Sequence, residues 1–220
     1  MERVLNSGPG ICQGTHRLVV KPVLAAISLG ATPDVMNGAL KAIHRINRNG
    51  DPADFVAAAF PLMGNHAGSM FTGHELEAIG SESVLQALLD SDIMKMMARR
   101  GMLEAIHVSP VIVERGQMGA SYTRVRSPVK HTAGWVRRTT ARAERRGKAL
   151  GKPVAVRQYD SSGLLSLTYG DAVLHVAESL SVYMGGEIQV NTYGFSTWAQ
   201  PSVLPVRPHA SKLEKLGDAA

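Results

Sequence analysis

The sequence has a single cysteine, Cys12, among its 220 residues. One thiol excludes an internal disulfide and a cysteine-based zinc site, which fits a reducing compartment. No apolar run approaches the roughly 18 residues that a membrane-spanning helix needs. The first residues, Met1 to Leu5, lack the basic stretch followed by an apolar run that marks a secretory signal. We therefore expect a cytoplasmic protein with no membrane partner.

Hydrophobic residues make up 45% of the chain, enough for one sizeable core or two small modules that pack together. The net charge is +6 and the isoelectric point is about 9.7. This balance favours an anionic partner such as nucleic acid or an acidic membrane surface, and does not by itself distinguish the two.

The positive charge is concentrated in one segment. Residues 121–160 contain eleven basic and two acidic side chains, a local charge of +9, so the rest of the chain carries −3. A localised basic patch is typical of phosphate recognition, and a merely solvated face is the alternative.

A helix is expected from His131 to Gly147, because this stretch has no proline and its arginines recur at helical spacing. Arg138, Arg142 and Arg145 fall at i, i+4 and i+7, on one face of that helix. Like charges at this spacing repel by a few tenths of a kcal/mol per pair, and an ordinary solvated helix would interleave acids. Contact with a polyphosphate turns the repulsion into counterion release, so the pattern favours nucleic-acid binding.

The first half of the chain alternates strand and helix patterns. The order is strand, helix, strand, strand, helix, strand, which predicts an α+β ferredoxin-like (RRM-like) domain with two helices on one face of a four-stranded antiparallel sheet. The expected elements are strands at 16–23, 55–63, 68–79 and 106–113, and helices at 32–49 and 81–101.

After residue 116 the pattern changes to short strands around the arginine-rich helix. We expect strands at 122–126, 154–158, 164–169 and 188–193. Prolines then recur in the C-terminal tail. The predicted organisation is a flexible leader (1–15), the ferredoxin-like domain (16–117), a smaller RNA-binding C-terminal domain (118–200) and a partly unpacked tail (201–220).

Several short motifs occur in a specific order. They are Lys41-Ala42-Ile43-His44, Phe60-Pro61, Tyr122-Thr123-Arg124-Val125-Arg126, Val136-Arg137-Arg138 with Glu144-Arg145-Arg146, and Tyr193-Gly194-Phe195-Ser196. Together with the element order from residue 82 to 114, this series resembles the repeat-processing endoribonucleases of subtype I-F CRISPR systems. The resemblance covers roughly residues 16–205 and lies in the joint order of the motifs. The segment from Tyr193 and the proline-rich tail are also similar to variants carried by CRISPR-associated transposons.

The resemblance implies a metal-independent endoribonuclease without a cofactor. It would bind a CRISPR repeat RNA stem-loop and cut the precursor at the base of the stem through attack of a 2′-hydroxyl, leaving a 2′,3′-cyclic phosphate. It would then stay bound to the product with the other subunits of a type I-F surveillance complex. The implied RNA-binding residues are Arg124, Arg126, Arg137, Arg138, Arg142, Arg145 and Arg146.

The implied catalytic residues are His44, Ser161 and Tyr193. A histidine suits the role of base because its pKa lies near physiological pH. By analogy Tyr193 orients His44, although a strand tyrosine usually serves packing. The family's R-S-x-S-T-G loop corresponds here to residues 157–163, one residue longer, in which Ser161 or Ser162 takes the place of the positioning serine. Arg126 stands where the commonest family sequence has glutamine at a base-reading position.

His44 falls at the border of the apolar arc of its helix, beside Lys41 and Arg48. We expect it to face solvent or a phosphate. Two alternatives to an active nuclease remain at this point: a catalytically inactive hairpin-binding subunit, and another housekeeping RNA-binding protein.

Overall fold

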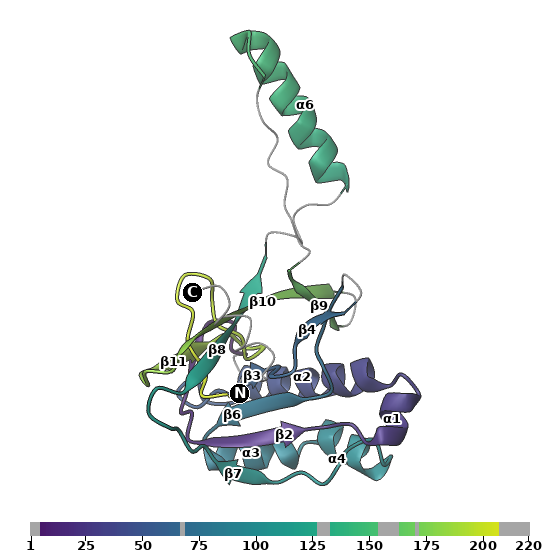
Figure 1. Cartoon of the computed structure of the whole chain (residues 1–220), viewed down its shortest axis with the longest axis vertical. Helices are drawn as coiled ribbons and strands as arrows, with labels where there is room; N and C mark the ends of the chain where they lie inside the picture. The colour runs from purple at the N-terminus through teal and green to yellow at the C-terminus, as the bar shows by residue number, and fades with distance from the viewer. Residues whose placement is uncertain (1–4, 67–68, 127–132, 154–162, 170–171, 207–220) are drawn as a thin grey trace.

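The computed structural model describes residues 5–66, 69–126, 133–153, 163–169 and 172–206 (Figure 1). The chain folds as mixed α+β with several antiparallel sheets, which confirms the predicted class.

A four-stranded sheet forms the centre of the N-terminal part. Its strand order is β3-β6-β2-β7, and every neighbouring pair is antiparallel. Residues alternate between its faces, so Leu18 and Val20 are fully buried while Arg17 and Val19, which precede them, are partly exposed. The strands are β2 (His16–Val20), β3 (Ala57–Ala59), β6 (Leu76–Gly80) and β7 (Val108–Pro110).

Helices α2 (Thr32–Asn49) and α3 (Glu82–Leu89) pack against this sheet. Helix α4 (Asp92–Arg99) packs against α2 and α3, and the short α1 (Leu24–Ser28) precedes them all. The bounds of α2 agree with the prediction. A single helix at 81–101 is wrong, because Ser91 caps a new helix: its hydroxyl accepts a hydrogen bond from the Met94 amide at 3.5 Å.

The strands of this sheet are shorter than predicted. The broken strand expected at 68–79 divides into β5 (Ser69–Phe71) and β6, and β5 forms a hairpin with β4 (Gly64–His66). Gly73 lies between β5 and β6 with φ of +74°, and a Cβ there would clash with Leu62. This glycine turn separates the hairpin from the sheet.

A second, three-stranded sheet has the order β8-β10-β9. Its strands are β8 (Met118–Val125), β9 (Leu165–Tyr169) and β10 (Ala172–Val182). The longest strand, β10, was not predicted, because His175, Glu178 and two serines interrupt the alternation of apolar residues expected of a strand. The signal was present: Leu174 and Val176 are fully buried and their neighbours are more exposed. The strand predicted at 154–158 lies outside the described residues.

Both ends of the described chain pack on the body. The prediction of a flexible leader is therefore wrong at β1, whereas the predicted tail is described only at residues 201–206. Near the N-terminus, β1 (Gly10–Cys12) pairs antiparallel with β11 (Ile188–Val190), and Gly10 lies so close to the Phe55 ring that no side chain would fit. Near the other end, Leu204 and Ala120 exchange backbone hydrogen bonds of 2.8 and 3.3 Å. These backbone pairings supply partners that local composition does not reveal.

The predicted boundary near residue 117 coincides with the start of β8, but one hydrophobic core crosses it. The Phe60 ring lies 6.2 Å from the rings of both Tyr122 and Phe195. The two parts of the body are therefore modules of one core.

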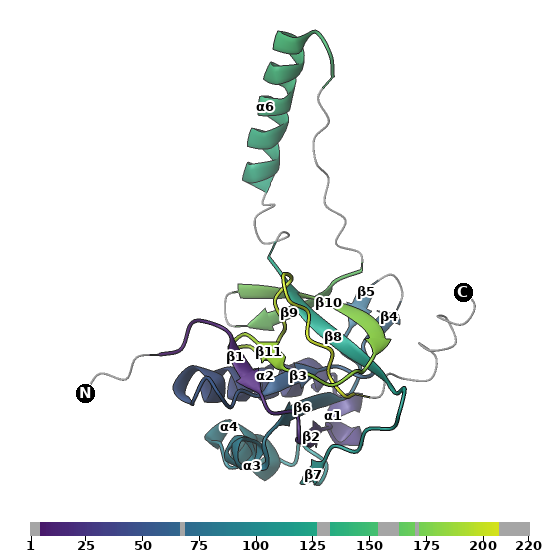
Figure 2. The ribbon, with the colours of Figure 1, turned by 90° about the vertical axis from the view of Figure 1, so that its left-hand side faces the viewer.

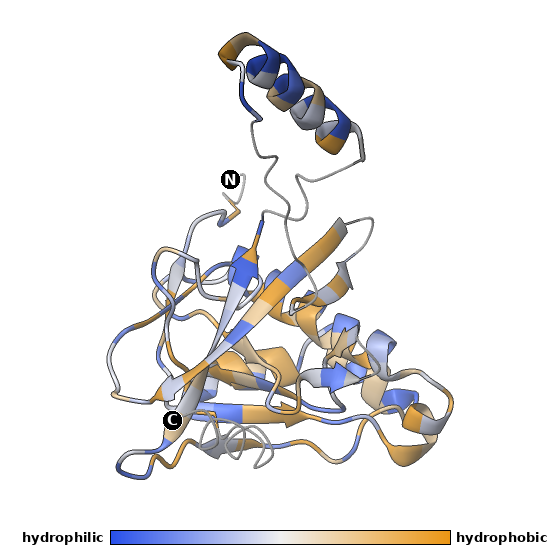
Figure 3. Ribbon diagram, turned by 45° about the horizontal axis from the view of Figure 1, so that its top comes forward, coloured by the Kyte–Doolittle hydropathy of each residue, from blue (hydrophilic) through white to orange (hydrophobic). Residues whose placement is uncertain are grey.

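Helix α6 (Ala133–Leu150) stands away from the body (Figures 1 and 2). It confirms the predicted arginine-rich helix, which extends three residues beyond Gly147. Hydrophilic residues recur on its successive turns, whereas the strands of the body carry hydrophobic runs (Figure 3). All five of its arginines are exposed: Arg137, Arg138, Arg142, Arg145 and Arg146.

We predict that Asn47→Ala lowers the free energy of unfolding by roughly 2–4 kcal/mol, because it leaves buried backbone groups unsatisfied. The Asn47 amide donates to the Val56 carbonyl at 2.8 Å and accepts from the Val56 amide at 2.8 Å. The control is Asn49→Ala, which removes an exposed amide from the same turn and should change stability by less than about 0.5 kcal/mol. Urea unfolding of both variants provides the measurement, and equal losses would contradict the prediction.

Candidate functional site

A turn at residues 191–195, the Asn191–Phe195 turn, forms one wall of the site. The Asn191 side chain accepts from the Tyr193 amide at 2.8 Å, and the Asn191 backbone amide donates to Phe195 at 2.8 Å. Gly194 has φ of +83°, and its carbonyl accepts from the Ala58 amide of β3 at 2.9 Å. The turn thus fixes Tyr193 over α2.

His44 packs beneath this turn. Its Nδ1 donates to the Thr192 carbonyl at 3.1 Å, and its ring stacks on Tyr193 with 4.0 Å between centroids and 7° between planes. Tyr169 of β9 meets the His44 ring edge-on at 5.3 Å. His44 is only 9% exposed. The expectation that it faces solvent is therefore wrong, because the turn and β9 cover the border of α2.

The hydrogen bond to Thr192 determines the tautomer of His44. A carbonyl oxygen only accepts, so the proton sits on Nδ1, and Nε2 of the neutral ring keeps its lone pair. Burial lowers the pKa of His44 below its ordinary value of 6.5. The Thr192 hydrogen bond raises the pKa, and the positive charges of Arg48 and Arg124 lower it further. The ring is thus a neutral base at physiological pH.

Arg124 of β8 lies beside the stack, and Arg126 follows directly after the last residue of β8. The Arg124 guanidinium carbon is 4.8 Å from the centroid of the Tyr193 ring, a cation–π contact. Burial lowers the pKa of Arg124, the Tyr193 hydroxyl raises it, and the charge of Arg126 lowers it. Among the described acidic side chains, none forms an ion pair with either arginine.

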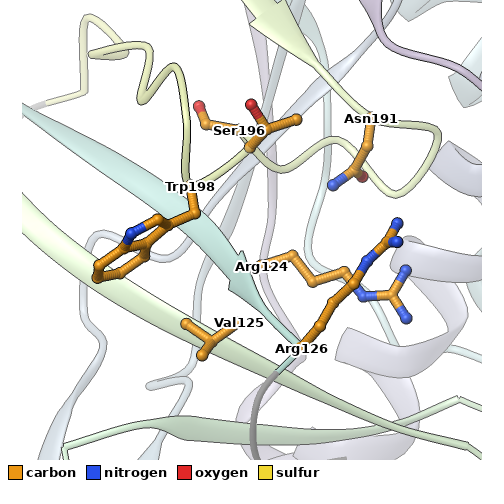
Figure 4. A pocket seen from close by; sticks show the side chains of 7 residues that line it. Arg124, Val125, Arg126, Asn191, Ser196 and Trp198 are labelled. Atoms are coloured by element: carbon orange, nitrogen blue, oxygen red, sulfur yellow. The ribbon is translucent and has the colours of Figure 1, made fainter.

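A cavity of about 620 Å³ opens at this point. Figure 4 shows the two guanidinium groups side by side near Asn191, with the Trp198 indole at the other side of the cavity. Its lining residues are Arg124, Val125, Arg126, Asn191, Ser196, Thr197 and Trp198.

The structure brings together part of the predicted site. His44, Tyr193 and Arg124 form one contiguous cluster, and Arg126 shares the cavity with Arg124. Ser161 lies outside the described residues. The arginines of α6 lie apart from this cluster in the structure (Figure 1).

Sequence reasoning missed three contributors: Tyr169, the Thr192 carbonyl and Trp198. A backbone carbonyl leaves no signature in a sequence. Tyr169 ends a predicted strand, and nothing in its neighbourhood points to His44.

Comparisons with known proteins give no further assignment. The chain matches no model of a known protein family, and a search of curated proteins returns no similar sequence. Within the described residues, no helix combines the length and hydrophobicity required to span a membrane.

We predict that the His44 imidazole titrates below 6.5 and that its pKa rises in Arg124→Gln, because a repelling positive charge is removed. NMR of the imidazole protons, assigned by difference against His44→Gln, measures both values. Arg45→Gln serves as the control, since Arg45 lies on the same helix and pairs with Asp92 at 3.9 Å. A titration above 6.5 in the unchanged protein would refute the electrostatic description.

Proposed function

We propose that this chain is an RNA-binding, metal-independent endoribonuclease that recognises a CRISPR repeat stem-loop. The observation that carries the proposal is the His44 stack: a neutral histidine whose Nδ1 is fixed by Thr192 lies beside Tyr193 and two arginines that have no acidic partner among the described side chains. Base and cations are the groups that RNA cleavage through a 2′-hydroxyl needs.

In the proposed reaction, Nε2 of His44 takes the proton of the 2′-hydroxyl. The 2′-oxygen attacks the adjacent phosphorus, the bond to the 5′-oxygen breaks, and that oxygen takes a proton from water. The products are a 2′,3′-cyclic phosphate on the upstream fragment and a free 5′-hydroxyl on the downstream one. Arg124 counters the charge that gathers on the phosphorus oxygens. From the resemblance, Ser161 positions the reacting ribose.

Binding is assigned to α6. Arg138, Arg142 and Arg145 are exposed and share one face, and a stem-loop offers phosphates along its groove at matching intervals. Each arginine can bind a phosphate or a base edge in a bidentate manner.

The strand order β3-β6-β2-β7, with α2 and the α3–α4 pair in the two crossovers, supports the ferredoxin-like plan for the N-terminal module. By the resemblance, the enzyme works in the cytoplasm and remains on its product as a subunit of a type I-F surveillance complex.

One observation favours a second candidate, a hairpin-binding subunit that does not cut. His44 is 9% exposed, so little of its ring is open to a bound RNA. Incubation of the protein with a synthetic repeat hairpin separates the two functions by the presence or absence of cleaved product.

We predict that His44→Ala abolishes cleavage and leaves hairpin affinity within a few-fold of the unchanged protein. The reason is that the buried imidazole accepts a proton in the reaction and contributes little to RNA binding. Cleavage by the unchanged protein should be equal in EDTA and in magnesium, since histidine and arginine supply the required groups. His16→Ala, on β2, is the control and should cleave normally. Full activity of His44→Ala, or an absolute need for metal, would remove this mechanism.

We predict that Arg142→Ala with Arg145→Ala weakens hairpin binding by several kcal/mol and flattens the plot of log affinity against log salt by roughly 0.7–0.9 per lost phosphate contact. The free double variant should melt no earlier than the unchanged protein, because repulsion on the helix is relieved.

The matched control is Arg99→Ala with Arg100→Ala, which removes the same charge from the end of α4. Hairpin titrations at several salt concentrations, together with melting curves, compare the two double variants. Equal loss in both would mean that net charge, and not the face of α6, determines binding.

A further inference from the structure

The cavity beside the His44 stack has two chemically different ends. At one end the side chains of Arg124, on β8, and Arg126, directly after β8, lie side by side, and at the other end lies the Trp198 indole (Figure 4). The Trp198 side chain is 74% exposed. A cationic end and an aromatic end in one cavity match a ligand that combines an anion with a flat ring.

The position of Trp198 is determined by backbone pairing. The Ser196 amide donates to Tyr122 at 2.9 Å, and the Arg124 amide donates to the Ser196 carbonyl at 3.2 Å, so this segment extends the edge of β8. A turn then follows, in which the Gln200 amide donates to Thr197 at 3.3 Å. The segment that carries the indole thus pairs with β8, the strand that contains Arg124 and directly precedes Arg126.

The cationic end of the cavity, formed by Arg124 and Arg126, favours an anionic ligand. The charge of Arg126 lowers the pKa of Arg124, so the two guanidinium groups repel each other, and no described carboxylate pairs with them. Phosphate oxygens would relieve this repulsion through charge-assisted hydrogen bonds. A purely apolar ligand would leave both charges unpaired.

We propose that the cavity binds one unpaired nucleotide of the RNA, with its base stacked on Trp198 and its phosphate between Arg124 and Arg126. This inference rests on the proposed function, because it names the part of the RNA that the site takes. A volume of about 620 Å³ lies within the range of small-ligand pockets, roughly 300–1,000 Å³.

The cationic end also identifies which nucleotide is bound. Arg124 contacts Tyr193, and Tyr193 stacks on His44, so the phosphate end adjoins the proposed cleavage chemistry. The bound nucleotide is therefore the single-stranded one next to the base of the stem. Every base has a π-face, so stacking on Trp198 tolerates any base at that position.

Fluorescence tests the stacking directly. Trp135 and Trp198 are the only two tryptophans, so a Trp135→Phe protein reports on Trp198 alone. An RNA pentanucleotide should quench this fluorescence, whereas the same RNA with abasic central positions, and inorganic phosphate, should not. Equal quenching by the abasic RNA, or no quenching by the intact RNA, would overturn the proposal.

Binding measurements test the place of the nucleotide. The probes are a synthetic type I-F repeat hairpin with a short single-stranded extension and the same hairpin trimmed to its stem. Trp198→Ala should weaken binding of the extended hairpin by roughly fivefold to a hundredfold and leave the trimmed one unchanged. Trp198→Phe should stay within a few-fold. Met184→Ala, which removes an 86% exposed side chain outside the cavity, should bind both normally.

Neither readout requires cleavage, so the two proposals fail separately. Quenching and selective loss of the extended hairpin without cleavage would support the nucleotide site and refute the nuclease. Cleavage by a Trp198→Ala protein that binds both hairpins normally would refute the nucleotide site and leave the nuclease standing.

Discussion

The Thr192 carbonyl is the contact on which the candidate site depends. It accepts hydrogen bonds from His44 at 3.1 Å and from Asn47 at 3.4 Å, and thereby ties α2 to a turn almost 150 residues later in the chain. Gly194 adds a second connection. Its positive φ allows the turn to approach β3 closely enough for the Gly194 carbonyl to accept a hydrogen bond from the Ala58 amide. If the hydrogen bonds to the Thr192 and Gly194 carbonyls were broken, Tyr193 would move away from the face of His44. The cation–π contact between Tyr193 and Arg124 would then be lost as well.

Burying a histidine among arginines opposes the charged form of its ring. The fold compensates through one hydrogen bond to Nδ1 and two aromatic contacts, which suit a neutral imidazole. Such an environment lowers stability as the pH falls below 6.5, because the unfolded chain binds the proton more tightly than the folded one. This penalty is the cost of holding a neutral imidazole beside Arg124, the arrangement on which the proposed chemistry rests.

The sequence pattern predicted the elements that depend on interactions between residues close together in the chain. Helix α2 has proline and an acid in its first turn and ends at glycine, and α6 has uninterrupted helical spacing, so both were found. The break between α3 and α4 depends on one serine cap, and β10 on an alternation that polar residues weaken. The site itself was only partly predictable. The motifs indicated His44 and Tyr193, but Tyr169 and the Thr192 carbonyl, which cover His44, lie far from His44 in sequence and reach it through tertiary packing.

The arginines of this chain occupy two different environments. In the proposed complex, one group would provide affinity for the RNA and the other would position a phosphate. Those of α6 are exposed on a helix that stands away from the body, so in the proposed complex they would contribute a salt-sensitive attraction with little geometric constraint. Arg124 is half-buried against Tyr193, and its position is fixed by the strand beneath it. A mobile polyanion can be captured by the first group and aligned only by the second. Under the proposed function, precise placement of a single phosphate would therefore depend on the body of the fold, where His44 lies.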